Sequence, residues 1–473
     1  MDIDVSKNNT NGKLSAEKDK IIEIENSLLT VFKALDRKQV SYSLLRGFDE
    51  LTDKVKMKEV DLLVSKAEMN EFVAVVTQLG YQELPPWGYA PHRFFVTYDA
   101  TADTWLKLDV VNDLVYGAPI RWLKFDYADE CLKHREREEP TYTLSPADEF
   151  VTLFLHCLLD KRQFRKERLE RLLFLKELAE NNLQMKKRIV GIFSRYLPAP
   201  LSWLTVIRLL GSNNKKSFNK HLTGISRKLF WLNPLGNTYR KFSTIFMRRM
   251  RPFLFMLKRQ GLWVALLAPD GGGKSTLSFS LLEQPFLRSK LIYMGANLDS
   301  STVGLPTTRW LKDKIKGMER KKTSKLIVKP LKMIAYINRV LEQWYRVAVG
   351  IYHKMLGRTV VFDRFVYDSY LSAPPKTKGQ KMRRWLIRST CPEADVAYFL
   401  DAPGQVLFDR KGEHSPEVLE RQRQRFLSLQ DVIRNMVIVD GTQSAQGVRS
   451  QILTDIWKMY GARENGKNNE GNG

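Results

Sequence analysis

Apolar and polar positions in the first third of the chain alternate between two periods. The 3.6-residue spacing of an amphipathic helix runs from Glu23 to Arg37, and a second helix is predicted from about Ala67 to Leu79. Between and after these helices lie short β-type apolar runs, at 41–45, 60–64, 94–98 and 105–111. Alternating elements of this kind predict an α/β domain over residues 21–145.

The periodicity then becomes helical, and it changes again near residue 261. Ser145 followed by Pro146 and two acidic residues is typical of a helix start, with Ser145 as the N-cap. We therefore expect a helical connector domain over 146–260. From 261 to 461, strand-like runs again alternate with helices, which predicts a second α/β domain. The polar ends of the chain, 1–20 and 462–473, are expected to be disordered tails.

Composition excludes several classes of protein. Hydrophobic residues make up 43% of the 473 positions, which is too many for a globally disordered chain. Three cysteines without CxxC spacing cannot build a disulfide framework, so we expect a reducing compartment. The N-terminus lacks a secretory signal, and the longest uncharged apolar stretch, 196–207, is too short to span a bilayer. We expect a cytoplasmic protein.

The formal net charge of +25 is concentrated in two windows. Residues 181–269 contain 17 Lys and Arg and no acidic residue, and residues 305–358 contain 14 basic residues against three acidic ones. Bulky apolar residues are interleaved with the cations. This combination is typical of a segment that binds an anionic membrane surface, which here would be the inner face of the membrane. Nucleic acid, a phosphate-rich substrate, and ordinary solvated helix faces are the other interpretations; nucleic acid ranks last, because no recognisable binding motif accompanies the charge.

The strongest chemical signal is a glycine-rich loop between a predicted strand and a predicted helix. A buried-strand run at 261–267 leads into Ala268-Pro-Asp-Gly-Gly-Gly-Lys-Ser-Thr276, and an apolar helix start follows. Glycines let main-chain N–H groups point inward at an anion, and the helix N-terminus adds partial positive charge. The pattern predicts an ATP site with Lys274 on the β- and γ-phosphates and the Ser275 hydroxyl on Mg²⁺. The expected nucleotide-binding residues are Asp270, Gly271, Gly272, Gly273, Lys274, Ser275 and Thr276.

This loop resembles the P-loop of the thymidylate kinase family, in which an acid also stands third in the motif. Thr359-Val-Val-Phe-Asp-Arg-Phe365 resembles that family's strand-end Asp-Arg-aromatic motif, and the segments 392–403 and 437–441 resemble its last two core strands. The resemblance implies a doubly wound parallel sheet over 261–461 and an ATP- and Mg²⁺-dependent kinase. Asp363 would hold the water shell of the metal and Arg364 the acceptor phosphate, both at the carboxyl end of a parallel strand.

The resemblance also implies a lid. The segment 410–414 and the arginine-rich helix 417–430 resemble it, with Arg410 expected to neutralise charge on the transferred phosphoryl group. The alternatives to Arg410 are Arg421, Arg423 and Arg425, which could instead lie on an exposed helix face. The family's Thr-Arg-Glu-Pro-type segment is missing at 291–297, and its Tyr-Gln-Gly segment is replaced at 368–375. We therefore expect a phosphoryl acceptor other than dTMP: a phosphate-bearing, sugar or glycan-linked molecule.

Three acids in the N-terminal domain form a second candidate site. Glu59 and Asp61 project from the same face of a predicted strand, and Asp109 lies at the centre of another. With the Arg-Gly turn at 46–47, the pattern resembles the nucleotidyltransferase superfamily, in which such acids bind metal for two-metal chemistry. The turn and Glu59 depart from the usual Gly-Ser pair and Asp, which favours a polysaccharide-linked branch. Solvent-facing acids without metal are the alternative, and His156 is expected to be packed rather than a ligand.

These observations predict a P-loop kinase fused to a nucleotidyltransferase-like domain, with Lys274, Asp363, Arg364 and Arg410 as catalytic residues. Two other functions stay open. One is a nucleotide-gated regulatory protein that holds nucleic acid, membrane or a partner through its basic segments. The other is a nucleotidyltransferase with a regulatory P-loop domain. The oligomeric state is not indicated by the sequence.

Overall fold

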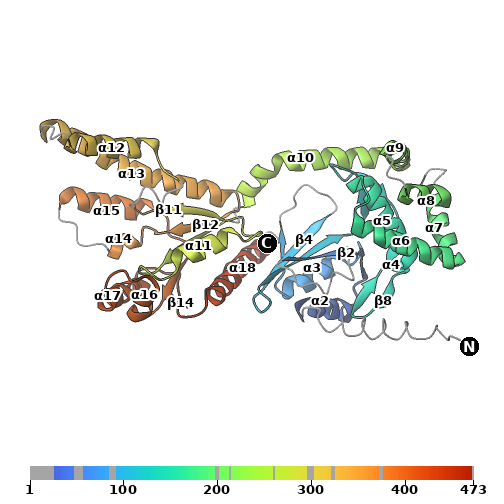
Figure 1. Cartoon of the computed structure of the whole chain (residues 1–473), viewed down its shortest axis with the longest axis horizontal. Helices are drawn as coiled ribbons and strands as arrows, with labels where there is room; N and C mark the ends of the chain where they lie inside the picture. Colours follow the sequence, from blue (N-terminus) through green and yellow to red (C-terminus); the bar gives the residue numbers. More distant parts are fainter. Residues whose placement is uncertain are drawn as a thin grey trace, which may run out of the picture. The chain divides into compact units, whose positions relative to one another are not determined.

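The computed structural model describes residues 26–46, 57–84, 92–197, 202–211, 215–258, 261–295, 303–320, 325–371 and 377–470. The chain divides into two compact units (Figure 1). Unit 1 comprises Met1–Arg251 with Asn468–Gly473, and unit 2 comprises Pro252–Lys467. The expected tail 1–20 and the glycine of the Arg-Gly turn lie outside the described residues.

Unit 1 contains a seven-stranded mixed sheet and a separate two-stranded hairpin. In sheet order the seven strands are β3 (Gln82–Leu84), β4 (Arg93–Asp99), β5 (Thr104–Val111), β2 (Met57–Val64), β1 (Tyr42–Leu44), β9 (Thr141–Thr143) and β8 (Glu136–Glu138). The hairpin pairs β6 (Leu114–Tyr116) with β7 (Leu123–Phe125). The central pair, β2 and β5, is parallel, with Asp61 directly opposite Asp109. This register brings two predicted site residues together.

The helices of unit 1 pack with its strands in two hydrophobic clusters. They are α2 (Asn26–Arg37), α3 (Met69–Gln78), α4 (Ala128–Lys133), α5 (Pro146–Leu155), the π-helical segment η3 (His156–Lys161), α6 (Lys166–Asn181), α7 (Leu183–Tyr196), α8 (Trp203–Gly211) and α9 (Lys215–Leu232). The next helix, α10 (Pro234–Lys258), runs across the boundary between the two units. The side chain of Ser145 accepts a hydrogen bond from the Asp148 main-chain N–H, which confirms the predicted start of α5.

The α5–α9 region packs into the same core as the strands that precede it. One cluster joins Tyr116 and Phe125 of the hairpin to Phe150, Phe193 and Leu229 of the helices. The second cluster joins α2 and α3 to the strands β1, β2, β4 and β5. The predicted segments 21–145 and 146–260 therefore share a core, and unit 1 extends through both as far as Arg251.

Unit 2 is built on a five-stranded parallel sheet with the order β11–β12–β10–β13–β14. Its strands in chain order are β10 (Leu262–Leu267), β11 (Lys290–Tyr293), β12 (Thr359–Asp363), β13 (Val396–Asp401) and β14 (Met436–Asp440). Every residue of β10 is buried, as expected for a strand covered on both faces. Because all five strands run the same way, their carboxyl ends lie at one edge, where Asp363, Asp401 and Asp440 end three of them.

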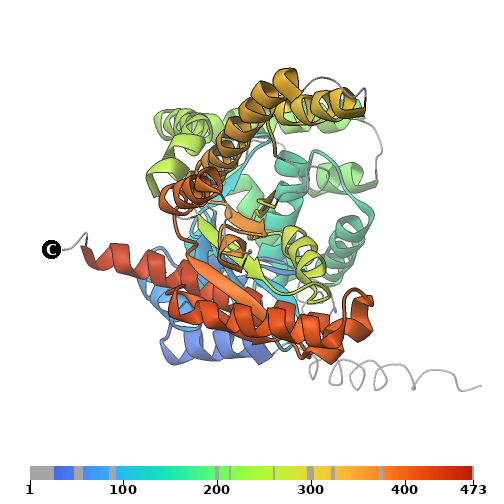
Figure 2. The same cartoon turned by 90° about the vertical axis from the view of Figure 1, so that its left-hand side faces the viewer.

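In unit 2, helices alternate with the strands along the chain. They are α11 (Lys274–Leu282), α12 (Pro306–Arg320), α13 (Lys325–Met355), α14 (Asp368–Leu371), α15 (Lys378–Thr390), α16 (Gly404–Lys411), α17 (Pro416–Leu427), the 3₁₀ turn η4 (Ser428–Asp431) and α18 (Ala445–Glu470). Figure 2 shows α12 alongside α13, and these two helices contact one another. The expected tail from residue 462 is the end of α18 as far as Glu470.

The described part of the chain has no helix with the length and hydropathy needed to cross a membrane.

Candidate functional site

The glycine loop joins β10 to α11 at the carboxyl edge of the unit 2 sheet. Gly271 and Gly273 have φ angles of 85° and 83°, a left-handed conformation that glycine adopts without a Cβ penalty. A Cβ on Gly271 would lie 2.5 Å from the main-chain oxygen of Leu407 in α16, and one on Gly272 would lie 2.5 Å from Ala268 Cβ. The loop thus needs glycine for its shape and for the close approach of α16.

Lys274, the first residue of α11, turns back over the loop. Its Nζ donates to the main-chain oxygen of Ala268 and, at 3.0 Å, to that of Pro269. Burial lowers the pKa of Lys274, while the carboxylates of Asp368 and Asp270 oppose this shift. Lys274 makes no ion pair among the described residues, because its ammonium group contacts main-chain oxygens. An anion in the loop could therefore bind this ammonium group without breaking an ion pair.

Asp270 of the loop faces an arginine and a histidine from other segments. Arg364 Nη2 lies 3.3 Å from one of its carboxylate oxygens, and His414 Nε2 lies 3.9 Å from the other. Arg364 and His414 have φ angles of 60° and 65°, a conformation that costs a non-glycine residue about 1–3 kcal/mol. Strain of this size persists only where the surroundings hold it, and it often accompanies function.

A cavity of about 1300 Å³ opens above the loop. The predicted residues Asp363, Arg364 and Arg410 line it together with the whole loop from Pro269 to Thr276. The structure thus places all the predicted kinase residues on one cavity. Its cations outnumber its acids, since Lys274, Arg364, Arg410, Lys411 and Arg449 face Asp270 and Asp363. An anionic ligand suits this lining.

Sequence reasoning missed part of this cavity. Lys411 lines it beside Arg410, the segment between β14 and α18 contributes Gly441 and Gln443, and α18 itself contributes Arg449. The available signal was a strand ending in Asp440-Gly441 before a helix, because every strand-to-helix turn of a parallel sheet opens at the same edge. Asp368 of α14 was also missed as a neighbour of Lys274; burial raises its pKa, and Lys274 opposes that shift.

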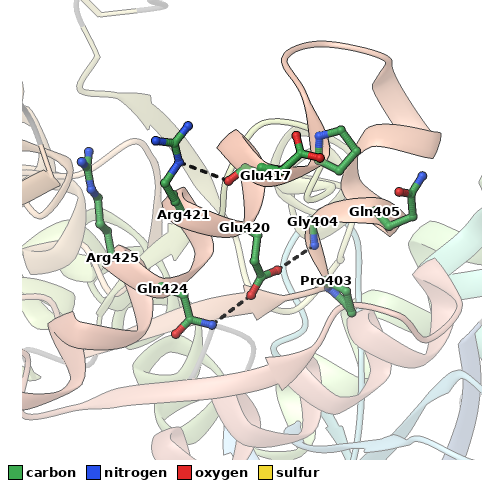
Figure 3. Close-up of a pocket in the computed structure, with 9 residues that line it drawn as sticks. Pro403, Gly404, Gln405, Glu417, Glu420, Arg421, Gln424 and Arg425 are labelled. Carbon is green, nitrogen blue, oxygen red and sulfur yellow. Dashed lines mark hydrogen bonds between the residues drawn. The ribbon is translucent and has the colours of Figure 1, made fainter.

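The alternative lid arginines do not line the glycine-loop cavity. Arg423 forms a two-point ion pair with Asp401 at 2.6 and 2.9 Å, and so anchors α17 to the end of β13. Arg421 and Arg425 line a separate hollow between α16 and α17, where Glu420 accepts hydrogen bonds from the Gly404 N–H and the Gln424 amide (Figure 3). Arg410 is therefore the one predicted lid arginine on the glycine-loop cavity among the described residues.

The second candidate site lies in unit 1, where the three predicted acids converge. Carboxylate oxygens of Glu59, Asp61 and Asp109 all lie within 4.8 Å of one another. Oxygen ligands at this spacing suit a hard divalent cation such as Mg²⁺. The trio faces a cavity of about 860 Å³ that it shares with Arg46, Arg121 and Lys161.

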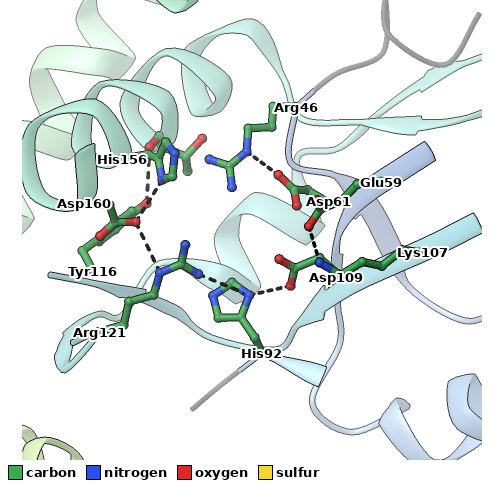
Figure 4. A network of polar contacts seen from close by, with 11 residues as sticks. Arg46, Glu59, Asp61, His92, Lys107, Asp109, Tyr116, Arg121, His156 and Asp160 are labelled. Atoms are coloured by element: carbon green, nitrogen blue, oxygen red, sulfur yellow. Dashed lines mark hydrogen bonds and ion pairs between the residues drawn. The ribbon is translucent and has the colours of Figure 1, made fainter. Parts of the chain in front are cut away.

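Each acid of the trio already has an arginine, lysine or histidine side chain as its neighbour (Figure 4). Arg46 Nε lies 2.5 Å from Asp61, Lys107 Nζ lies 2.7 Å from Glu59, and His92 Nδ1 lies 2.5 Å from Asp109. Although burial alone would raise it, the pKa of Asp61 is held below its ordinary value by Arg46. Arg46 and Lys107 thus offset the charge of two of the three acids, and a metal ion would compete with these side chains for the carboxylate oxygens.

His156 lies deep in the same region, as predicted for a packed histidine. It is 3% exposed, and its Nδ1 lies 2.9 Å from Asp160 Oδ2. Burial lowers the pKa of His156 to about 4, against the opposing effect of Asp160. Asp160 is in turn held by the Gly117 N–H at 2.7 Å. His156 is not a member of the described metal-type cluster.

No protein-family model matches the chain, and no curated protein matches it.

Proposed function

We propose that unit 2 is an ATP- and Mg²⁺-dependent phosphotransferase of the thymidylate kinase-like type. The observation that carries this proposal is the glycine loop between β10 and α11, which opens a cavity of about 1300 Å³ lined by an excess of cations. The five-stranded parallel sheet supports it, because ligands of such sheets bind at the carboxyl ends of the strands where the strand order reverses. The strand β10 occupies that position, since its two neighbours in the sheet both come later in the chain.

The residues of the loop fit an ATP·Mg²⁺ complex. Main-chain N–H groups of Gly271 to Lys274 bind phosphate oxygens, and the Lys274 ammonium neutralises their charge. Ser275 and Asp363 offer a hydroxyl and a carboxylate oxygen, the ligand types that Mg²⁺ prefers. ATP supplies the γ-phosphoryl group. Arg364 and Arg410 hold its oxygens and those of the acceptor, which lowers the cost of charge that develops during transfer.

The acceptor side of the cavity is lined by Leu291 and Tyr293 at the end of β11. An apolar and an aromatic side chain here do not supply the charged groups of the family's nucleotide acceptor site. We therefore propose an acceptor other than dTMP, of the phosphate-bearing, sugar or glycan-linked class.

The test is transfer of labelled γ-phosphate from ATP to a panel of nucleoside monophosphates, sugars and lipid-linked glycans. We expect one labelled acceptor to appear in equal amount with ADP. Lys274→Ala is expected to lower the rate at least about 100-fold, which corresponds to about 3 kcal/mol of transition-state stabilisation. Lys458→Ala, at an exposed position of α18, is the matched control. Release of ADP and free phosphate alone would contradict the kinase and favour the nucleotide-gated regulatory protein.

A second candidate function is nucleotidyl transfer by unit 1, favoured by the convergence of Glu59, Asp61 and Asp109 within 4.8 Å. Two-metal chemistry needs such a trio to bind divalent cations. The test is Mn²⁺ binding followed by electron paramagnetic resonance, with Asp61→Asn as the variant. Binding that Lys274→Ala retains and Asp61→Asn loses would support this function, and equal binding by wild type and Asp61→Asn would contradict it.

A further inference from the structure

One face of α13 exposes an uninterrupted row of apolar side chains. Between residues 333 and 352 the exposed positions on this face are spaced by one, three, four or seven residues, so they lie on the same side of a helix. Its large side chains are each 40–59% exposed: Met333, Ile334, Ile337, Leu341, Trp344, Tyr345, Ile351 and Tyr352. Ala348 completes the face, and the other exposed residue of this stretch, Arg339, lies outside it. We call these nine residues the α13 face.

The opposite side of α13 packs on the unit 2 sheet, so α13 already has its place in the hydrophobic core and the α13 face is a second, uncovered side of the helix. The Trp263 indole N–H donates to the Gly350 main-chain oxygen at 3.1 Å. A Cβ on Gly350 would lie 3.1 Å from the Phe362 ring. Arg346 is 1% exposed and binds Glu342 and the main-chain oxygens of Val303 and Gly295.

Cations and further aromatic residues lie on the two helices that contact α13. Trp344 donates to Thr390 of α15 at 2.8 Å, and α15 exposes Met382 and Trp385. The other neighbour, α12, exposes Trp310 with Lys314 over its ring. Together α12, α13 and α15 contain sixteen Lys and Arg and three acidic residues.

We propose that unit 2 docks on an anionic membrane surface through the α13 face, with the cations of α12 and α15 against lipid phosphates. Aliphatic, Trp and Tyr side chains beside Lys and Arg form the composition of helices that lie in the bilayer interface. The cations supply attraction to the negative surface, and the α13 face supplies the apolar area that inserts. This docking goes beyond the proposed phosphotransfer, since no residue of the α13 face lines the glycine-loop cavity.

Charge decides between this occupant and two others. A second copy of the chain in a two-fold interface would bring two sets of these cations together, which like-charge repulsion opposes. Nucleic acid would engage the cations but would leave Ile334, Ile337 and Leu341 without apolar partners. An anionic bilayer satisfies the charge and the apolar face together.

The same combination recurs in unit 1. On α10, Leu235, Tyr239, Phe242 and Phe246 follow one another at helical spacing and are 61–85% exposed. This helix lies within the 89-residue stretch that contains no Asp or Glu. Helices α10 and α13 thus both expose a row of apolar side chains within a strongly basic part of the sequence.

The experiment is co-sedimentation of the full chain with vesicles of phosphatidylcholine containing about one third phosphatidylglycerol, against vesicles of phosphatidylcholine alone. We expect binding to the anionic vesicles only, with loss at high salt. Ile337→Glu adds a charge in the α13 face, and Val432→Glu makes the same change at another exposed apolar position of unit 2. We expect Ile337→Glu to weaken binding at least tenfold and Val432→Glu to weaken it less than twofold, with equal circular dichroism and thermal midpoints.

Three results would overturn the proposal. The first is failure of the wild type to bind anionic vesicles, and the second is an equal effect of the two substitutions, which would make the attraction purely electrostatic. The third is a concentration-dependent dimer in light scattering that Ile337→Glu abolishes, since this would assign the α13 face to a second copy. Each result is independent of whether unit 2 transfers phosphate.

Discussion

The two candidate sites differ in how they neutralise their own charge. In unit 1 each acid of the trio has a partner side chain within 2.7 Å: Arg46 on Asp61, Lys107 on Glu59 and the His92 imidazole on Asp109. In unit 2 the loop lysine binds main-chain oxygens and Asp363 makes no ion pair among the described residues. Breaking a partly buried ion pair costs free energy, whereas redirecting a lysine from carbonyl oxygens to a phosphate costs little. The glycine-loop cavity is therefore better prepared for a ligand than the carboxylate trio.

The largest expected effect concerns the shape of the glycine loop. Gly271→Ala adds a Cβ 2.5 Å from the Leu407 oxygen at a φ of 85°, so the loop and α16 must both shift. We expect about 2–4 kcal/mol less stability and at least about 100-fold weaker binding of an ATP analogue, measured by chemical unfolding and calorimetry.

Gly80→Ala is the matched control, because Gly80 also has a φ of 85° but its nearest neighbour would be 3.9 Å away. It should cost about 1–2 kcal/mol of backbone strain and leave nucleotide binding unchanged. Equal nucleotide affinities of the two variants would show that the loop does not form the site.

The second effect concerns the buried histidine beside the unit 1 trio. The pKa of His156 is about 4 in the folded chain and about 6.5 in the unfolded chain. Between these two pH values the unfolded state therefore binds a proton at His156 and the native state does not. The stability of unit 1 should be unaffected above pH 7 and fall as pH drops, by about 2 kcal/mol at pH 5. Urea unfolding, with hydrogen exchange in α5 as the reporter, measures this loss.

His156→Gln should remove this part of the pH dependence while carboxylate effects at lower pH remain. If wild type and His156→Gln lost the same stability between pH 7 and pH 5, the imidazole of His156 would be solvated in the folded chain and would not contribute to the pH dependence of stability.

Much of the fold could be predicted from the sequence, because its local signals agree with the tertiary structure. The strands at 42–44, 57–64, 93–99 and 104–111 lie where alternating or apolar runs were expected, and Ser145 caps α5. The glycine loop was predicted with its flanking strand and helix because glycine, lysine and serine occur there at fixed positions. Asp363, Arg364 and Arg410 were placed through the resemblance, and all three line the cavity.

Other features depend on contacts that no local pattern encodes. The pairing of Arg423 with Asp401 joins positions 22 residues apart, so the sequence left Arg421, Arg423 and Arg425 as equals. His92 had no sequence signal at all, because its partner Asp109 lies on a neighbouring strand. The α13 face could not be predicted from the sequence either, because the side of a helix that stays exposed depends on which side packs on the sheet.

A third, smaller effect separates the two acids at the strand ends of unit 2. Arg423→Ala removes a two-point ion pair whose groups are less than one quarter exposed, and we expect a loss of about 1–2 kcal/mol. Asp363→Asn removes a carboxylate without an ion pair, so stability should change by less than about 0.5 kcal/mol while phosphate transfer is lost. Chemical unfolding and the transfer assay measure both. A large loss of stability with Asp363→Asn would give this acid a structural role like that of Asp401.

The smallest expected effect tests how well the unit 1 trio is balanced. Glu59→Gln removes the Lys107 ion pair, which is worth about 0–1 kcal/mol for a carboxylate that is 42% exposed, and also removes one of three mutually repelling charges. If the side chains that contact the trio offset its charge, these effects cancel and stability changes by less than about 0.5 kcal/mol without added metal. A gain above about 1 kcal/mol would mean that repulsion dominates and that the site requires a bound cation. Denaturation in the presence of a chelator measures the sign, and a gain would make unit 1 the better prepared of the two sites.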